Sequence, residues 1–119
     1  MAFSKEEQEF VAYVIDLMQS IGPVSARRMF GGHGIFLEGL MFGLIAGNTL
    51  YLKVDAESKG SFEARGLEAF GYSKKGKEYK MSYYQAPEEA LEDPQEMMAW
   101  ANQSYGVAIA AAARKRKKR

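Results

Sequence analysis

The stretch RRMFGGHGIFLEGLMFGL, residues 27–44, holds the residue types best suited to chemistry in this sequence. It contains the chain's single histidine, His33, two adjacent arginines and five glycines. Three kinds of site use such residues: a glycine-rich phosphate loop, a metal centre and a nucleophile activated by histidine. Each of these sites needs a particular structural context, which the neighbouring residues either provide or lack.

A phosphate loop places its glycines between a strand and the N-terminus of a helix, whose amides hold the anion. Here the glycines are followed by the strand-like run GIFLEGLMFGL, so no helix supplies those amides. Glycine pairs in sheets mark bulges or sharp bends, or places where a second backbone approaches closely. We therefore predict a structural turn or bulge role for five glycines: Gly31, Gly32, Gly34, Gly39 and Gly47.

Metal and acid/base chemistry find little support in the sequence. There is no cysteine, and a metal at His33 would need carboxylate ligands that do not cluster near it. A serine nucleophile would also depend on His33 as its base. The acidic residues between 88 and 96 stand at predicted helix starts, where carboxylates favour the helix dipole. We expect no catalytic residue, no metal, no cofactor and no enzymatic activity.

The arginine pair and the basic C-terminus are the candidate contacts for a partner. If the segment that contains Arg27 and Arg28 is a strand, the two side chains point to opposite faces, so we expect at most one of them to be exposed. The inner arginine would be a paired structural residue or a contact to an anion or partner. The basic run is RKRKKR at the very end of the sequence: Arg114, Lys115, Arg116, Lys117, Lys118 and Arg119.

Charge is unevenly distributed along the chain. Without the last six residues the sequence has ten basic and fifteen acidic side chains, a net charge of −5. The tail has three possible roles: a solvated helix end, a non-specific contact to nucleic acid, or a contact to an acidic protein surface. It has no interleaved aromatic residues, so nucleic-acid binding would be weak, independent of base sequence and sensitive to salt.

The periodicity of apolar residues predicts the elements that carry these candidates. Ser4 and Glu7 have capping-box spacing before an amphipathic helix at about 4–20. Alternating apolar residues in 35–37, 40–44 and 50–54 predict a three-stranded meander. A brief helix within 58–66 and a hairpin with its turn at 74–77 follow. Asp93 and Pro94 start a last helix that runs into the alanines before the tail.

These elements predict an α+β fold: a two-layer structure in which helices cover one face of an antiparallel sheet, in the order α-β-β-β-α-β-β-α. We expect one domain over residues 1–113 and a basic tail over 114–119. The mixed, acidic N-terminus does not resemble a signal peptide, and the longest apolar runs are too short to span a bilayer. We therefore expect a cytoplasmic protein without membrane contact.

The last helix has an unusually wide apolar surface of about 200°, against roughly 100° for a one-sided helix. Either another helix of the same chain covers part of it, or it forms a dimer or partner surface. The residues concerned are Met97, Met98, Trp100, Ala101, Tyr105, Val107, Ala108 and Ile109.

Three segments in this order, RRMFGGHGIF, LYLKVD and MSYYQAPEEALEDPQEMMAWANQS, resemble the N-terminal domain family of the competence regulator TfoX, also called Sxy. The resemblance extends from about Ile21 to Tyr105. It implies an α+β fold with helices on one face of an antiparallel sheet, a tendency to form homodimers and no known catalytic residues. The family's regulators promote transcription of competence genes together with another transcription factor. The resemblance thus implies a protein-interaction module with a role in transcription, whose partner the sequence does not identify.

Overall fold

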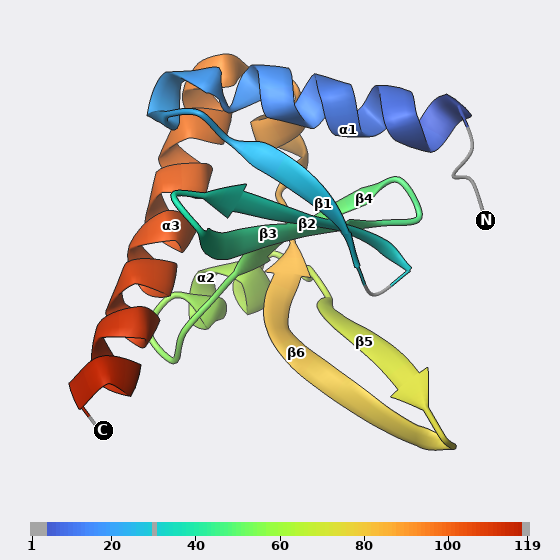
Figure 1. Cartoon of the computed structure of the whole chain (residues 1–119), viewed down its shortest axis with the longest axis vertical. Helices are drawn as coiled ribbons and strands as arrows, with labels where there is room; N and C mark the ends of the chain where they lie inside the picture. Colours follow the sequence, from blue (N-terminus) through green and yellow to red (C-terminus); the bar gives the residue numbers. More distant parts are fainter. Residues whose placement is uncertain (1–4, 30, 118–119) are drawn as a thin grey trace.

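The computed structural model describes residues 5–29 and 31–117. It is an α+β structure in which three helices pack against an antiparallel six-stranded sheet of order β1-β2-β3-β4-β6-β5 (Figure 1). The first helix, α1, spans Lys5–Leu17, and a short 3-10 helix, η1, follows at Gln19–Ile21. This agrees with the predicted helix near 4–20, although the proposed cap Ser4 lies outside the described residues.

Four strands follow in place of the predicted three: β1 Ser25–Met29, β2 Gly32–Leu37, β3 Leu40–Ala46 and β4 Thr49–Lys53. Strands β2 to β4 are the predicted meander. The additional strand, β1, pairs antiparallel with β2 at the edge of the sheet. Its sequence SARRM lacks the apolar alternation that identified the other strands, and in the structure only Ala26 and Met29 of this edge strand are half-buried.

The second half of the chain follows the predicted order. Helix α2, Lys59–Ala64, leads to strands β5, Ala69–Lys74, and β6, Lys77–Gln85. A 3-10 helix, η2, at Glu88–Leu91 precedes helix α3, Pro94–Lys117. Asp93 caps α3, because its Oδ2 accepts a hydrogen bond from the Glu96 amide at 3.2 Å. The prediction that the last helix stops before the basic run is wrong, since α3 continues through Arg114 to Lys117.

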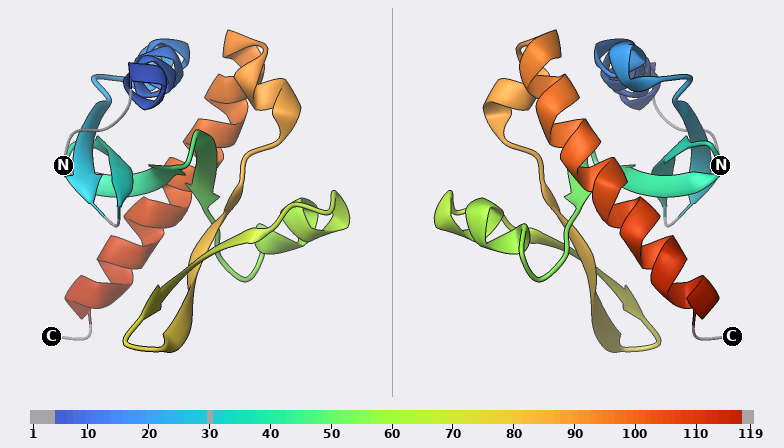
Figure 2. Two further views of the ribbon diagram at one scale, coloured as in Figure 1. Left: turned by 90° about the vertical axis from the view of Figure 1, so that its right-hand side faces the viewer. Right: turned by 90° about the vertical axis from the view of Figure 1, so that its left-hand side faces the viewer.

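The main core lies between the helices and one face of the sheet. It joins Val14 of α1, Ile35 of β2, Leu52 of β4, Phe62 of α2 and Met97 of α3 in one buried cluster. All three helices therefore cover the same face, as the two-layer prediction requires, and Figure 2 shows α3 running diagonally across the molecule beside the strands.

The opposite face of the sheet has a small core of its own. Leu44 of β3, Phe70 of β5 and Tyr83 of β6 are buried together there, and the rings of Tyr51 and Phe70 meet edge to face at 5.1 Å. In the sheet order, β4 and β6 separate β3 from β5, so the sheet must curl to bring these residues together. Figure 1 shows the corresponding bend along β6.

The wide apolar surface of α3 is mostly covered within the chain. Met97, Ala101, Val107 and Ala108 are buried, and Trp100 meets Phe62 of α2 edge to face with ring centroids 5.2 Å apart. Next to this contact Arg65 pairs with Glu89 and lies over the Trp100 ring at 5.1 Å. Of the apolar residues predicted for this surface, Met98 and Ile109 stay exposed, at 36% and 47%. Contacts with α2 and the sheet thus account for most of the apolar arc.

Candidate interaction groove

The glycine segment forms the β1–β2 hairpin and the start of β2. Met29 pairs with Gly32, and Gly31, just before Gly32, has φ +75°. Gly32 has ordinary backbone angles, but a Cβ built there would lie 2.0 Å from the carbonyl oxygen of Ile45. Of the roles predicted for this pair, a bulge or a sharp bend or a close backbone approach, Gly31 has the left-handed backbone of a bend and Gly32 the close approach, while the register shift between β2 and β3 falls between Ile35 and Phe36.

The other predicted glycines occupy two kinds of position. Gly39 and Gly47 have positive φ, +80° and +57°, in the turns that flank β3. Gly34 is covered by side chains: a Cβ there would lie 2.4 Å from the Met29 sulfur and 2.9 Å from the Phe36 ring. These positions require a small residue or a left-handed backbone and offer no helix amides to an anion.

The expectation that at most one arginine of β1 is exposed is wrong. Arg27 and Arg28 are both exposed, because β1 is an edge strand. The Arg27 guanidinium lies 4.2 Å from the centroid of the Phe36 ring, on the face opposite the helices. Arg28 faces the other way, beside the partly buried His33 with which it pairs in the β1–β2 ladder. The structure therefore does not bring the two arginines together into one site.

Residues 5–29 and 31–117 hold neither a metal-type cluster nor a helix of membrane-spanning character. In this part of the chain, no three His, Cys, Asp or Glu side chains gather into a group that could hold a metal ion. None of its helices has the length and apolar character needed to cross a bilayer.

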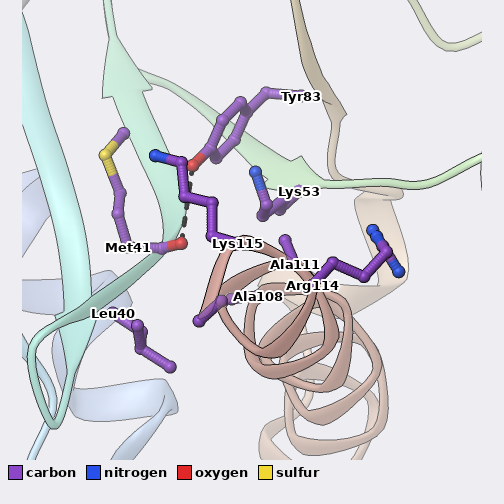
Figure 3. Close-up of a pocket in the computed structure, with 9 residues that line it drawn as sticks. Leu40, Met41, Lys53, Tyr83, Ala108, Ala111, Arg114 and Lys115 are labelled. Atoms are coloured by element: carbon purple, nitrogen blue, oxygen red, sulfur yellow. Dashed lines mark hydrogen bonds between the residues drawn. The ribbon is translucent and has the colours of Figure 1, made fainter. Parts of the chain in front are cut away.

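A chemically distinctive hollow lies between the C-terminal turns of α3 and the end of the sheet. We call it the α3 groove; it has a volume of about 530 Å³ (Figure 3). Its apolar lining comes from small and aliphatic residues, and its polar lining from three cations and one tyrosine. The lining residues are Leu40, Met41, Lys53, Tyr83, Ala108, Ala111, Ala112, Arg114 and Lys115.

Tyr83 and Lys53 form the polar wall of the α3 groove. The Tyr83 hydroxyl donates a long hydrogen bond, 3.5 Å, to the carbonyl oxygen of Met41, and burial raises the pKa of Tyr83 to about 12. The Lys53 ammonium lies 5.0 Å from the centroid of the Tyr83 ring. Burial, and then the positive charge of Lys115, holds the pKa of Lys53 below its ordinary value. The wall therefore carries a partly desolvated positive charge.

The basic run reaches this groove in part. Arg114, Lys115 and Arg116 are exposed on the last turns of α3, and Arg114 and Lys115 line the α3 groove. Nothing is described for Lys118 and Arg119, and only the helical backbone for Lys117. Sequence reasoning treated the six residues as one tail. Helical spacing was the missed signal, because the basic residues point in different directions once the helix continues.

The family model of the TfoX N-terminal domain matches residues 16–108, which include every helix and strand from the end of α1 into α3. The chain belongs to the TfoX N-terminal domain family. The match reaches the groove residues up to Ala108 and stops before Arg114 and Lys115.

A curated relative in this family is the DNA transformation protein TfoX1 of Aliivibrio fischeri. The two sequences are 33% identical over 82 residues, which is 69% of this chain and 37% of the relative. The chain thus aligns with little more than a third of the length of that protein. Membership of the TfoX N-terminal domain family agrees with the resemblance found from the three sequence segments.

Proposed function

We propose that this chain is a protein-interaction module, without catalytic activity, that acts in the regulation of DNA transformation. Its family and the name of its relative TfoX1 support the biological process. The α3 groove is the observation that carries the interaction role. It combines an apolar floor with a basic rim, the combination found where protein surfaces bind one another.

The walls of the α3 groove are regular structure. Leu40 and Met41 begin β3, Lys53 ends β4, Tyr83 lies in β6, and the remaining lining residues belong to α3. The backbone of strands and helices is ordered before a partner arrives, so binding to this groove loses little backbone conformational entropy. A cytoplasmic regulator that recruits a partner protein would use such a preformed surface.

The test is a crosslinking experiment in a transformable bacterial host. A photoreactive phenylalanine replaces Ala112, which lines the α3 groove, and in a control it replaces Gln95, which is exposed on the first turn of α3. The two positions are about 25 Å apart along the helix. We expect irradiation to join a specific protein at position 112 and not at position 95.

The same host provides a functional readout. We expect a strain that carries Lys53→Gln and Lys115→Gln together to lose the crosslink from position 112 and to change its transformation frequency. The change Lys59→Gln, at an exposed residue of α2 that does not line the groove, should leave both unaffected. Equal crosslinking from positions 95 and 112, or none from 112, would contradict the proposed role of the groove.

A homodimer is the second part of the proposal and rests on the family resemblance. The exposed Ile109 and Met98 are the apolar residues of the α3 arc left for such an interface. Light scattering at tens of micromolar should then show twice the monomer mass of 13.3 kDa. A monomer alone at that concentration would remove homodimerisation from the proposed function.

Non-specific binding to nucleic acid is the alternative function, and the continuation of α3 into the basic run favours it. Helical structure through Lys117 keeps Arg114 and Arg116 on an exposed helix end, where they could contact phosphates. The test is a titration with duplex DNA at two salt concentrations, with the full chain and with a chain truncated after Ala113. Salt-sensitive binding that truncation abolishes supports this function, and failure of both forms to bind at low salt refutes it.

A further inference from the structure

Two lysines from distant parts of the sequence meet at the α3 groove. Lys53 ends strand β4, and Lys115 lies in the last turns of α3, yet both side chains line the α3 groove. Figure 3 shows both side chains extending toward Tyr83, while Arg114 lies farther to one side. Among the residues that the structure describes, no carboxylate forms an ion pair with any of these three cations.

The position of Lys115 follows from helical spacing. Met97, Ala101, Ser104 and Ala108 are buried on α3 at steps of four, three and four residues. The next steps of three and four residues along the helix lead from Ala108 to Ala111 and then to Lys115. Residues spaced in this way lie on one side of a helix, so the stripe that packs against the sheet ends in an ammonium group at the edge of the core.

Two neighbouring ammonium groups without a carboxylate repel each other in the free protein. The cost is greater for Lys53 because it is partly buried, although its contact with the Tyr83 ring offsets part of that cost. An anion placed between the two lysines would remove the repulsion and replace part of the lost hydration. The groove is therefore electrostatically complementary to a ligand with negative charge.

The rest of the lining restricts which anion fits. Leu40, Met41 and the alanines of α3 form an apolar floor, which favours a carboxylate flanked by apolar side chains over a uniformly charged chain. Single-stranded nucleic acid would need an aromatic ring on which a base can stack. The aromatic ring of the groove, Tyr83, is only 5% exposed, and the Lys53 ammonium lies near it.

The geometry points to an acidic peptide segment of the partner protein as the occupant of the α3 groove, with a glutamate or aspartate held between Lys53 and Lys115 and apolar neighbours on the alanine floor. This inference rests on the proposed interaction function and specifies the chemistry of the partner. It assigns the two lysines the role of a carboxylate clamp.

The test measures fluorescence anisotropy of the full chain with three labelled probes. These are a twelve-residue peptide that alternates glutamate and leucine pairs, the same peptide with glutamine in place of glutamate, and a twelve-nucleotide single-stranded DNA. We expect the acidic peptide to bind most tightly. Lys53→Gln and Lys115→Gln should each weaken it on the order of tenfold, as for a hydrogen bond to a charged group. Lys53→Arg should keep most of the affinity because it retains the charge.

The control Lys59→Gln removes the same charge outside the groove and should change the affinity less than twofold. Circular dichroism checks that each variant is folded. Equal binding of the acidic and neutral peptides, tighter binding of the DNA, or an equal effect of Lys59→Gln would overturn the carboxylate clamp. If the acidic peptide does not bind but the crosslink from position 112 persists, the carboxylate clamp is refuted and the proposed interaction function stands. If the crosslink fails, the proposed function itself is wrong.

Discussion

Replacing Gly32 with alanine should be among the most damaging single-methyl additions in this domain. The added Cβ would lie 2.0 Å from the Ile45 carbonyl oxygen, whereas real Cβ atoms essentially never approach closer than 3.0 Å. Strands β2 and β3 must therefore separate locally by at least 1.0 Å, the difference between these distances. The contact is with backbone, so no side-chain rotation relieves it.

The energetic cost can be estimated from what this separation disturbs. Losing one or two hydrogen bonds of the β2–β3 ladder costs about 0.5–1.5 kcal/mol each. Displacing Ile45, which is 1% exposed, adds about 1–2 kcal/mol by comparison with other overpacked cores. We expect Gly32→Ala to lower the free energy of unfolding by about 2–4 kcal/mol and the Tm by on the order of 10 °C.

Urea unfolding monitored by circular dichroism provides the measurement, with the midpoint and slope fitted separately. Substitution of Gly31 is the control that separates the effect of a steric contact from the effect of backbone angle. Gly31 has φ +75°, but the space around its Cβ position is open. Asparagine tolerates left-handed angles, so Gly31→Asn should cost only a few tenths of a kcal/mol, whereas Gly32→Asn should be at least as damaging as Gly32→Ala. A Gly32→Ala variant within 0.5 kcal/mol of the parent would show that β2 and β3 are not this close.

Three further predictions concern α3 and the α3 groove. Gly106→Ala should stabilise the domain by about 0.8–1 kcal/mol in urea unfolding, because Gly106 is helical with open space at its Cβ position; a loss of stability would show that the space is occupied. Ser104→Ala should raise the Tm, since the Ser104 hydroxyl is buried without a hydrogen-bond partner, and removing it avoids a desolvation cost of roughly 1 kcal/mol; a lower Tm would mean that this hydroxyl is satisfied. The raised pKa of Tyr83, about 12, predicts that stability present below pH 10 is lost as pH rises from 10 toward 12, because the folded state holds the phenolic proton more tightly. Tyr83→Phe should reduce this alkaline loss, and an unchanged pH profile would contradict the burial of the ring.

Much of the fold follows from local patterns in the sequence. Strands β2, β3 and β4 bury residues on one face and were recognised from alternation, and Asp93 and Pro94 located the start of α3 correctly. Strand β1 was missed because it gains its hydrogen bonds from β2 without burying an apolar stripe. The sequence predicts a last helix that runs into the alanines before the basic run, whereas α3 continues to Lys117 because lysine and arginine are good helix formers.

The α3 groove could not be predicted from the sequence. Lys53 and Lys115 are brought together by the order of the strands and the crossing of α3, and both depend on tertiary packing. The sequence shows that Met97, Ala101, Ser104 and Ala108 are spaced by four, three and four residues, and this spacing indicates the side of the helix on which Lys115 lies. It does not indicate which strand end the side chain meets. The basic run was recognised as a candidate contact, but its division between the groove and solvent required the structure.

The exposed arginines of β1 have a consequence for how copies of this domain behave at high concentration. An edge strand offers unpaired amides and carbonyls to which the strand of another molecule can add, and such addition leads to aggregation. Arg27 and Arg28 place positive charge on both faces of the β1 edge, so two copies that meet edge to edge along β1 bring like charges together. Replacing both arginines with threonine should therefore increase turbidity at millimolar concentration. For the same reason, any homodimer would have to use a surface other than a continuous sheet through β1.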